Sequence, residues 1–319
     1  MLRSSFITAA LAASAGACLA VLAGCGQFSP AYMKPLSEQT RTLLAEKGMT
    51  EDAPILMRVF KAESELEIWK QREDGRFYHF KTYPICSYSG GLGPKLKQGD
   101  QQAPEGFYLV SMDQLNPKSK YHLSFDLGFP NAFDRAHGRS GGNLMIHGDC
   151  TSVGCYAMTD AVMEEIFILS REALVGGQTS FQVHAFPFRM TTANLASQQK
   201  HEWFNYWQGL KEGFDYFEAT RLEPKITVCE KRYLINAVFN DPAPRYSATG
   251  SCPRYQKGPV TAFKPLPKPR NAVAQASLAK PLGSVLNLKF GPAKPAYTAF
   301  TLGPATPDLP VQKKQQKKK

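Results

Sequence analysis

Long apolar runs and C-terminal acidic residues are both scarce in this sequence. The leading apolar run, Phe6 to Leu22, is shorter than the ~20 residues of a good membrane-spanning helix, which argues against a permanent transmembrane anchor. From residue 253 to the end, thirteen Lys or Arg stand against Asp308 as the one acid, so this segment carries +12. The total of +11 leaves −1 for residues 1–252, and so neutral a body argues against nucleic acid as its substrate.

Residues 1–25 have the composition of a targeting segment. Arg3 supplies the positive end, and Leu22-Ala23-Gly24-Cys25 is typical of a bacterial lipoprotein cleavage box, which predicts a cut before Cys25 and lipidation of its thiol. The alternative is an ordinary secretory signal cut nearby, with Cys25 incidental. No Asp follows Cys25, so the usual inner-membrane retention signal is missing. We therefore expect a periplasmic protein with a lipid anchor in the outer membrane of a Gram-negative bacterium.

Cysteine is scarce enough for each residue to be considered in turn. Beyond the leader the chain has five cysteines, and in an oxidising compartment an odd number leaves one unpaired. Cys155 is the best candidate for the free thiol, since its loop also supplies a histidine and a helix start. We expect a disulfide between Cys229 and Cys252. Cys86 and Cys150 form either a second disulfide or two buried thiols.

The stretch from Asn143 to Asp160 organises the chain. An apolar run predicts a short buried strand ending at His147-Gly148, and a glycine-punctuated loop then leads to Cys155. Thr159-Asp160 is expected to cap an amphipathic helix over residues 161–174. A cysteine between such a loop and a helix start, with an imidazole nearby, is where a thiolate is favoured. The arrangement indicates covalent acyl transfer, with Cys155 attacking and His147 taking its proton.

Three rival interpretations use neighbouring residues. His147, Cys150 and Cys155 could ligate zinc, but their uneven spacing and the lack of a second Cys-x-x-Cys make this weak, so we expect no metal and no cofactor. Cys150 could be the nucleophile, although it lacks the preceding glycine that lets a backbone N–H point at an oxyanion. His137 could be the base, but it lies in a loop rich in Gly and Arg, whereas His147 is fixed at a strand end.

Short strands dominate the expected secondary structure, and several of them with turn signals and few helices favour a β-sandwich or half-open barrel. Helices are expected around 37–47, at 159–174 and at 197–211, the last with an aromatic stripe that we assign to the core. The expected strands are 54–60, 65–70, 76–81, 85–88, 106–111, 121–127, 143–147, 180–185, 225–229 and 233–239.

Composition divides the chain into four parts. The signal segment, residues 1–25, precedes a linker at 26–50 and a catalytic domain at 51–252. Residues 253–319 are rich in Pro, Ala and Lys, with eleven of the chain's 23 prolines. Such a composition cannot bury enough apolar surface to offset ordering, so we expect a basic disordered tail. This tail is either simply solvated or adheres weakly to anionic wall polymer or lipid head groups.

The motif around the cysteine resembles the L,D-transpeptidase catalytic (YkuD-type) family, most closely its YafK-like branch. The matching residues are His147-Gly148 and Ser152-Val153-Gly154-Cys155, with further likeness at 83–86, 89–95, 103–108 and 129–139, so the resemblance spans roughly residues 50 to 190. The short insert between His and Cys, Val153 and Ala157 depart from many family members and are typical of this branch. The resemblance implies an α+β, mainly β fold: an L,D-transpeptidase-like β-sandwich or half-open barrel with a few helices.

The resemblance also implies a substrate and a setting: the stem peptides of peptidoglycan, in cell wall biogenesis and cell shape. The Gly148 carbonyl would orient the His147 imidazole, as in the family. Backbone N–H groups near Gly154 and Cys155 would stabilise the oxyanion, and Ser152 would shape the loop by bonding to the backbone. Tyr156 could wall the cleft or simply pack. Arg135 and Arg139 could clamp a free carboxylate of the substrate.

The sequence leaves the acyl acceptor open. An amine acceptor makes the protein an L,D-transpeptidase. Water makes it an amidase of the same family, which would release an outer-membrane lipoprotein from diaminopimelate in the wall. A non-catalytic wall-binding lipoprotein, with a lipid anchor in front and a basic tail behind, is the alternative from another class of protein.

Overall fold

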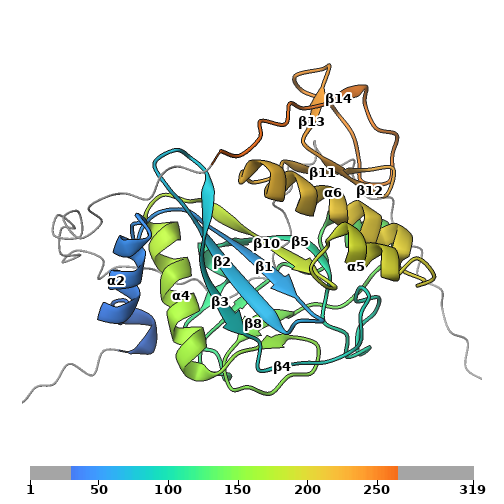
Figure 1. The fold of residues 1–319 in the computed structure, drawn as a ribbon. Helices are drawn as coiled ribbons and strands as arrows, with labels where there is room; N and C mark the ends of the chain where they lie inside the picture. The colour runs from blue at the N-terminus through green and yellow to red at the C-terminus, as the bar shows by residue number, and fades with distance from the viewer. Residues whose placement is uncertain (1–29, 265–319) are drawn as a thin grey trace, which may run out of the picture. The chain divides into compact units, whose positions relative to one another are not determined.

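The computed structural model describes residues 30–264 of the 319-residue chain. The chain divides into two units, the first ending at Pro35, and the described part of this first unit contains the 3-10 turn Ala31–Met33. The second unit begins at Leu36, and its described part holds fourteen β-strands and five α-helices (Figure 1). The predicted α+β, mainly β fold is confirmed.

The first sheet has five strands, longer than those of the second, in the order β3 (Phe77–Pro84), β2 (Glu65–Gln71), β1 (Ile55–Phe60), β10 (Ser180–Phe186) and β5 (Gly106–Ser111). Strand β1 runs parallel to β10, and the other neighbours are antiparallel. Every residue of β1 is buried, as expected for a strand that is covered on both faces.

Helix α6 (Phe204–Thr220) covers one face of this sheet. Phe60 and Phe186 meet Phe214 of the helix edge to face, with ring centroids 6.4 and 5.5 Å apart. On the opposite face, Phe181 of β10 meets Phe125 of the second sheet at 5.7 Å. The alternation of side chains along each strand thus places apolar residues on both sides, which produces two cores separated by one sheet.

The second sheet also has five strands, ordered β4 (Ser87–Tyr88), β9 (Tyr156–Ala157), β8 (Met145–His147), β7 (Ser124–Asp126) and β6 (Leu115–Asn116). Strands β8 and β9 are parallel, and the other pairs are antiparallel. Within residues 30–264 the two large sheets share no strand, so they form an open sandwich and not a closed barrel.

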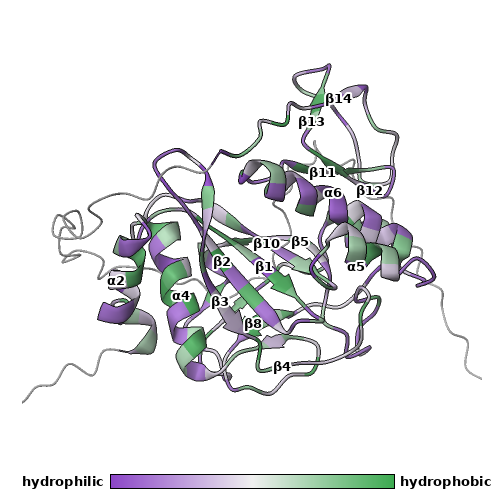
Figure 2. Cartoon of the chain, viewed as in Figure 1, coloured by the Kyte–Doolittle hydropathy of each residue, from purple (hydrophilic) through white to green (hydrophobic). Residues whose placement is uncertain are grey.

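Two helices join the sandwich at one side. Helix α4 (Asp160–Val175) packs on β1 and β7 and buries most of its apolar residues, and Figure 2 shows that both hydrophobic and hydrophilic residues occur along it. Helix α2 (Glu38–Glu46) begins at the Ser37 cap, and its Thr40 hydroxyl donates to Glu165 of α4 at 2.9 Å. The predicted helices at 37–47 and 159–174 are therefore present.

The third predicted helix starts later than expected. Residues 198–203 form turns, and α6 begins at Phe204, after the short helix α5 (Thr192–Ser197), which the sequence analysis missed. Thr191 caps α5 by accepting from the Asn194 N–H. The aromatic stripe does belong to the core, since Trp207 and Leu210 are fully buried.

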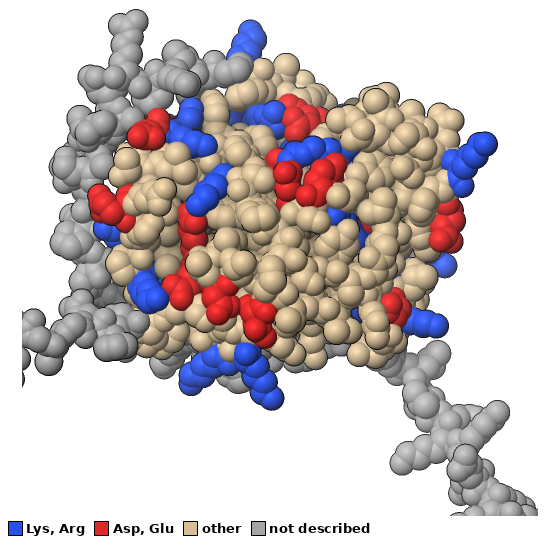
Figure 3. All heavy atoms as spheres, turned by 60° about the horizontal axis from the view of Figure 1, so that its bottom comes forward, with Lys and Arg blue, Asp and Glu red and all other residues tan. Residues whose placement is uncertain are grey.

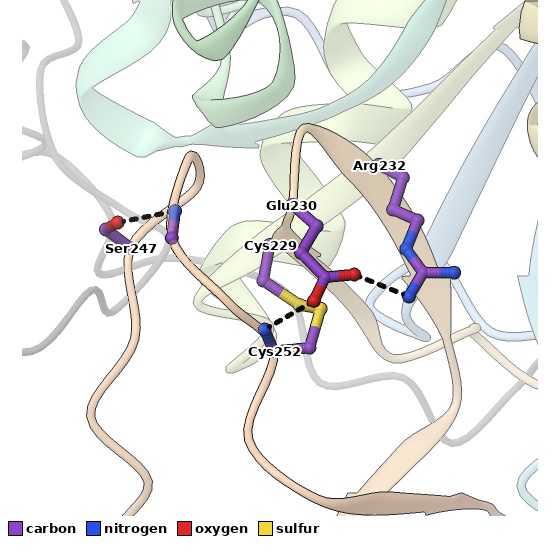
Figure 4. The surroundings of a disulfide bond; sticks show 6 residues. Cys229, Glu230, Arg232, Ser247 and Cys252 are labelled. Atoms are coloured by element: carbon purple, nitrogen blue, oxygen red, sulfur yellow. Dashed lines mark hydrogen bonds and ion pairs between the residues drawn. A yellow bond between two sulfur atoms is a disulfide. The ribbon is translucent and has the colours of Figure 1, made fainter.

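Two small hairpins complete the described chain: β11 (Ile226–Cys229) with β12 (Arg232–Ile235), and β13 (Ala237–Phe239) with β14 (Tyr255–Lys257). A disulfide joins Cys229 to Cys252, the pair that the sequence favoured (Figure 4). Beside it, the Glu230 carboxylate accepts from the Cys252 N–H at 3.1 Å and pairs with Arg232 at 2.7 Å. Strand β14 lies beyond residue 252, where we expected disorder to begin, because pairing with β13 gives this segment hydrogen-bond partners.

Charges of both signs are interspersed on the face seen in Figure 3, and much of that face is uncharged, in keeping with a nearly neutral body. No helix between residues 30 and 264 combines the length and apolar character needed to cross a membrane. The predicted leader with Cys25, and the predicted tail after residue 264, lie outside the described residues.

Candidate active site

Cys155 and His147 project from the same face of the second sheet. Ile146 is in register with Tyr156, and His147 with Ala157. Cys155 is two residues before Ala157 and therefore lies on the same side of the sheet as His147. Strand spacing and rise put the two Cα atoms about 8 Å apart, a distance that their side chains can bridge. The Met145 N–H donates to Cys155 Sγ at 3.4 Å, which ties the sulfur to β8. Cys155 is partly exposed and is the one free cysteine in the described chain.

The His147 imidazole is held in one tautomer. Its Nδ1 lies 2.6 Å from the Gly148 carbonyl oxygen, which can only accept, so Nδ1 carries the proton and Nε2 keeps its lone pair. The Tyr121 ring packs against it, with centroids 4.9 Å apart. The Gly148 N–H is shared between the carbonyls of Tyr121 and Leu123, at 3.0 and 3.1 Å. This arrangement presents a fixed base, with the Gly148 carbonyl in the orienting position that the resemblance implied.

The surroundings of Cys155 and His147 favour the uncharged form of each, and the Cys155 thiol donates to the Asn143 carbonyl at 3.7 Å. Burial lowers the pKa of His147, although the Gly148 carbonyl and Asp149 act in the opposite direction. Burial raises the pKa of Cys155; the Met145 N–H and Lys95 oppose this rise and Asp126 adds to it. Both shifts favour the uncharged forms. Before substrate binds, the site therefore favours a protonated nucleophile and an unprotonated base.

The expectation of a thiolate stabilised by a helix start is wrong. Strand β9 follows Cys155 directly, and α4 begins at Asp160, well beyond it. The field of a helix terminus acts over about one turn, so it does not reach the sulfur. The predicted start of the helix was right; the error was to expect that a helix beginning at Thr159-Asp160 lies close enough to act on Cys155.

A second disulfide braces the loop between His147 and Cys155. Cys150 is bonded to Cys86, which precedes β4, and the neighbouring Asp149 N–H donates to the Asp160 side chain at 2.7 Å. Asp149 and Cys150 both have positive φ values, 68° and 50°, a conformation that is uncommon for residues other than glycine. The disulfide settles the alternative left open for these two cysteines.

The disulfide also removes Cys150 as a candidate nucleophile and as a zinc ligand. Among residues 30–264, no group of three or more His, Cys, Asp or Glu side chains is placed to hold a metal ion. The other rival, His137, is the exposed C-cap of α3 (Ala132–Ala136), where it stacks on Phe133 with ring centroids 4.2 Å apart.

The predicted oxyanion donors are already engaged. The Gly154 N–H donates to Ser89 Oγ at 2.6 Å, and the Cys155 N–H donates to Ser152 Oγ at 2.9 Å. Ser152 Oγ in turn donates to the Cys155 carbonyl at 2.7 Å, so Ser152 shapes the loop as expected. Gly154 has φ +98°, a conformation that favours glycine and turns the chain into Cys155. Use of either N–H by a substrate oxygen therefore requires it to leave its serine.

The two arginines do not form the expected carboxylate clamp. Arg139 is buried and donates to Asp134 Oδ1 at 2.7 Å, with its guanidinium over the rings of Phe133 and Tyr206. Arg135 is exposed on α3 and donates to the carbonyl of Pro130. Asp134 also completes the capping box of α3 with Asn131, so its partner Arg139 belongs to the framework of that helix.

Tyr156 does not wall the cleft. Its side chain is fully buried, and its hydroxyl donates to the Pro104 carbonyl at 2.6 Å. The reason is alternation along the strand: Cys155 faces outward, so its neighbour in β9 faces the core. The role assigned to Tyr156 is therefore one of packing.

The segment from Ser89 to Glu105, which lies beside the cysteine loop, is fastened by a buried ion pair. Lys61 Nζ donates to Glu105 at 3.1 Å and to the carbonyls of Gly93 and Ala103 at 2.9 and 3.0 Å. The other Glu105 oxygen accepts from Trp207 of α6 at 2.8 Å. Every oxygen of the carboxylate thus has a partner, which is what makes a buried charge tolerable.

The sequence analysis missed three residues of the site: Ser89, Tyr121 and Asp126. Asp126 is in register with Met145 of β8, and Met145 in turn lies beside Cys155, so Asp126 is two strand spacings from the cysteine. Only Ser89 carried a signal in sequence, since it lies in a stretch that resembles the family. The partnerships of the other two arise from strand pairing and leave no local pattern.

Comparison with known proteins finds clear relatives among curated sequences but not among family models. No family model matches the sequence. Two Escherichia coli proteins, from strains K12 and O157:H7 and both named "Putative L,D-transpeptidase YafK", are 47% identical to the chain over 184 residues. The match covers 58% of this chain and 74% of each relative.

Solved structures give weaker likenesses. The helical cell shape determining protein Pgp2 of Campylobacter jejuni is 20% identical, with a TM-score of 0.34 over 57% of this chain and 68% of its own. Bd1075 of Bdellovibrio bacteriovorus is 19% identical, with a TM-score of 0.32 over 59% of this chain and 65% of its own.

Proposed function

Since the chain belongs to the YafK-like branch of the L,D-transpeptidase (YkuD-type) family, we propose that it processes peptidoglycan stem peptides through a thioester on Cys155. The family makes it an enzyme of the L,D-transpeptidase type that acts in the cell wall. The observation that carries the mechanism is the arrangement of the free Cys155 and the oriented His147 on one face of neighbouring strands.

In the proposed first step, the Cys155 sulfur attacks the carbonyl carbon of a stem-peptide amide. The thiol proton passes to His147 Nε2, which the Gly148 carbonyl leaves unprotonated by holding the proton on Nδ1. As the C–N bond breaks, His147 delivers the proton to the leaving amine, and the acyl group remains on sulfur. Because the surroundings favour the uncharged form of both groups, the proposed mechanism transfers the thiol proton as the sulfur attacks.

The second step transfers the acyl group to an acceptor that approaches the same face. An amine acceptor forms a new amide, which is L,D-transpeptidation, the activity we propose. Hydrolysis is the second candidate, and Ala157 favours it: this residue is fully buried in β9, so the position two after the nucleophile offers no polar group to hold an amine. In that case the enzyme is an amidase that releases a lipoprotein from diaminopimelate in the wall.

We further propose that Cys25 is lipidated and that the enzyme works in the periplasm, anchored to the outer membrane. The support is the Leu22-Ala23-Gly24-Cys25 box and the absence of Asp at the next position. Palmitate labelling of cells expressing the full chain is expected to mark the protein, and Cys25→Ser is expected to abolish the label. A labelled Cys25→Ser protein would contradict the anchor.

The catalytic proposal is tested by intact-mass analysis of the chain without residues 1–25, incubated with purified muropeptides. A stem-peptide adduct is expected on the wild-type protein and on no Cys155→Ala protein. His147→Gln is expected to slow adduct formation by about 10²- to 10⁴-fold, the usual contribution of a general base. Addition of an amine acceptor separates the candidates: a new cross-linked product supports transpeptidation, and product release without a new bond supports the amidase. Unmodified Cys155 under all these conditions would refute both.

A further inference from the structure

A carboxylate with no ionic partner lies on the face of the sheet that carries the nucleophile. Asp126 of β7, Met145 of β8 and Cys155, the residue before β9, form one row: Asp126 is in register with Met145, whose N–H bonds to Cys155 Sγ. Residues in register on neighbouring strands project to the same side. The row spans two strand spacings, so the outer Cα atoms are about 10 Å apart.

Asp126 is half-buried, and a backbone N–H is its hydrogen-bond donor within residues 30–264. One carboxylate oxygen accepts from the Gly128 N–H at 2.7 Å, and no salt bridge in the described chain involves this residue. Lys95, the cation that influences Cys155, is committed elsewhere, since it bonds to Asp100 at 2.5 Å and to the Lys97 carbonyl at 3.0 Å. Burial raises the pKa of Asp126, which is the cost of holding a partly desolvated charge without a cation. The side chain is therefore a partly buried acceptor that can take a further hydrogen bond from a positive group.

We infer that Asp126 binds the side-chain ammonium group of the diamino residue whose carbonyl Cys155 attacks. This inference rests on the proposed function, because it concerns the donor peptide of that reaction. An extended side chain that carries an ammonium six bonds from the reacting carbonyl spans about 7 Å. A charge-assisted hydrogen bond of about 2.8 Å closes the remaining distance to the carboxylate. Met145, between the two, offers an apolar surface to the intervening methylene groups.

The placement reverses the charge that the sequence led us to expect at the site. Arg135 and Arg139 were expected to hold a substrate carboxylate, but their guanidinium groups bond to Pro130 and Asp134. In the proposed complex, the Asp126 carboxylate binds an ammonium group instead. Because the Asp126 charge opposes ionisation of the thiol, its neutralisation by a bound cation makes the Cys155 thiolate easier to form. Substrate binding thereby assists the nucleophile.

The experiment compares two synthetic tetrapeptide stems that differ only at the side-chain amine of the third residue, which is free in one and acetylated in the other. Wild-type protein is expected to favour the free amine about tenfold in kcat/KM, the factor of one charge-assisted hydrogen bond. Asp126→Asn, which keeps an oxygen for the Gly128 N–H, is expected to bring the ratio close to one. The matched control is Asp215→Asn, which alters an exposed pair with Lys211 on α6 and is expected to leave the ratio at the wild-type value.

Two further readouts separate this role from a structural one. The preference of the wild-type protein for the free amine is expected to weaken as salt rises, although less than a contact between two exposed charges would, because Asp126 is half-buried. Asp126→Asn is also expected to let iodoacetamide alkylate Cys155 at lower pH. Equal rates on both peptides with wild-type protein, or a uniform loss on both with Asp126→Asn, would overturn the inference while leaving the thioester mechanism intact. No adduct with either peptide would remove the proposed function, and the inference with it.

Discussion

Removal of the Cys86–Cys150 disulfide is expected to damage both stability and catalysis. The bond closes a loop with a sequence separation of 64, and the chain-entropy relation gives about 4 kcal/mol for a loop of this length. The bond between Cys229 and Cys252 closes a separation of 23 and is expected to contribute about 3 kcal/mol. The two bonds therefore differ little in stability. They differ in position, because only Cys150 lies in the loop between His147 and Cys155.

The catalytic effect follows from the backbone of that loop. Asp149 and Cys150 are held at positive φ, and Gly148, whose carbonyl orients His147, is their neighbour. Without the bond to Cys86 the loop can relax, which frees the carbonyl from the imidazole. We expect the double variant Cys86→Ala/Cys150→Ala to lose at least tenfold in kcat at temperatures where it is folded. Cys229→Ala/Cys252→Ala is expected to keep its kcat.

Urea unfolding followed by tryptophan fluorescence measures the first effect, and adduct formation on muropeptides at low temperature measures the second. Both double variants retain Cys155 and His147, so any difference in kcat reports on the brace and not on the reacting groups. If the two variants lose similar stability and keep equal kcat, the disulfide has no part in positioning His147. If removal of Cys86 and Cys150 leaves stability unchanged, the loop-closure calculation itself is refuted.

Three further outcomes follow from the structure. Because burial lowers the pKa of His147, the base stays neutral to below pH 6.5. As the pH falls, kcat/KM is therefore expected to drop with a midpoint below pH 6.5. A midpoint above pH 6.5 in the pH profile would contradict the assignment of His147 as the base. Arg139→Met leaves the buried Asp134 carboxylate without its ionic partner, so we expect the free energy of unfolding in urea to fall by about 3 kcal/mol. KM is expected to be unchanged in the folded protein. The matched variant Arg135→Ala alters an exposed residue and is expected to change the free energy of unfolding by less than about 0.5 kcal/mol. Gly213→Ala would place a β-carbon 2.5 Å from the Phe107 ring. We therefore expect it to destabilise the protein by about 1–3 kcal/mol in thermal unfolding, despite the better helix propensity of Ala. A gain in melting temperature would show that the Phe107 ring moves freely.

The sequence predicted most of the large sheet because its strands are long enough to show a period. β5 (Gly106–Ser111) has the predicted bounds, and β1, β2 and β10 differ from them by a single residue at one end. The segment 233–239 was predicted as one strand, yet it divides at Asn236, whose φ of 54° turns the chain from β12 into β13. A β-propensity scale does not register a single left-handed residue within an apolar run, so this break had no signal.

At the site, the nucleophile and base followed from one local motif, but the partners of the charged residues did not. Arg139 pairs with an aspartate five residues earlier, and the Asn131-x-x-Asp134 capping box was the available hint that Asp134 was held in place. Asp126 lies near the site because β7 pairs with β8. The residues next to it in sequence do not distinguish it from a solvent-facing acid, so the sequence could not predict this position. Residues brought to a site by strand pairing cannot be predicted from local sequence patterns, because their partners are distant in sequence.

The late position of β10 in the chain has a consequence for how the protein is made. Strands β1 and β5 both pair with β10, which begins at Ser180, after the whole second sheet and α4. A chain that emerges from its N-terminus therefore presents two unpaired strand edges until residue 186 is available. Contacts so distant in sequence form slowly, and open edges invite pairing with other chains. A nascent or truncated chain that ends before Ser180 is thus the form of this protein most in need of a chaperone.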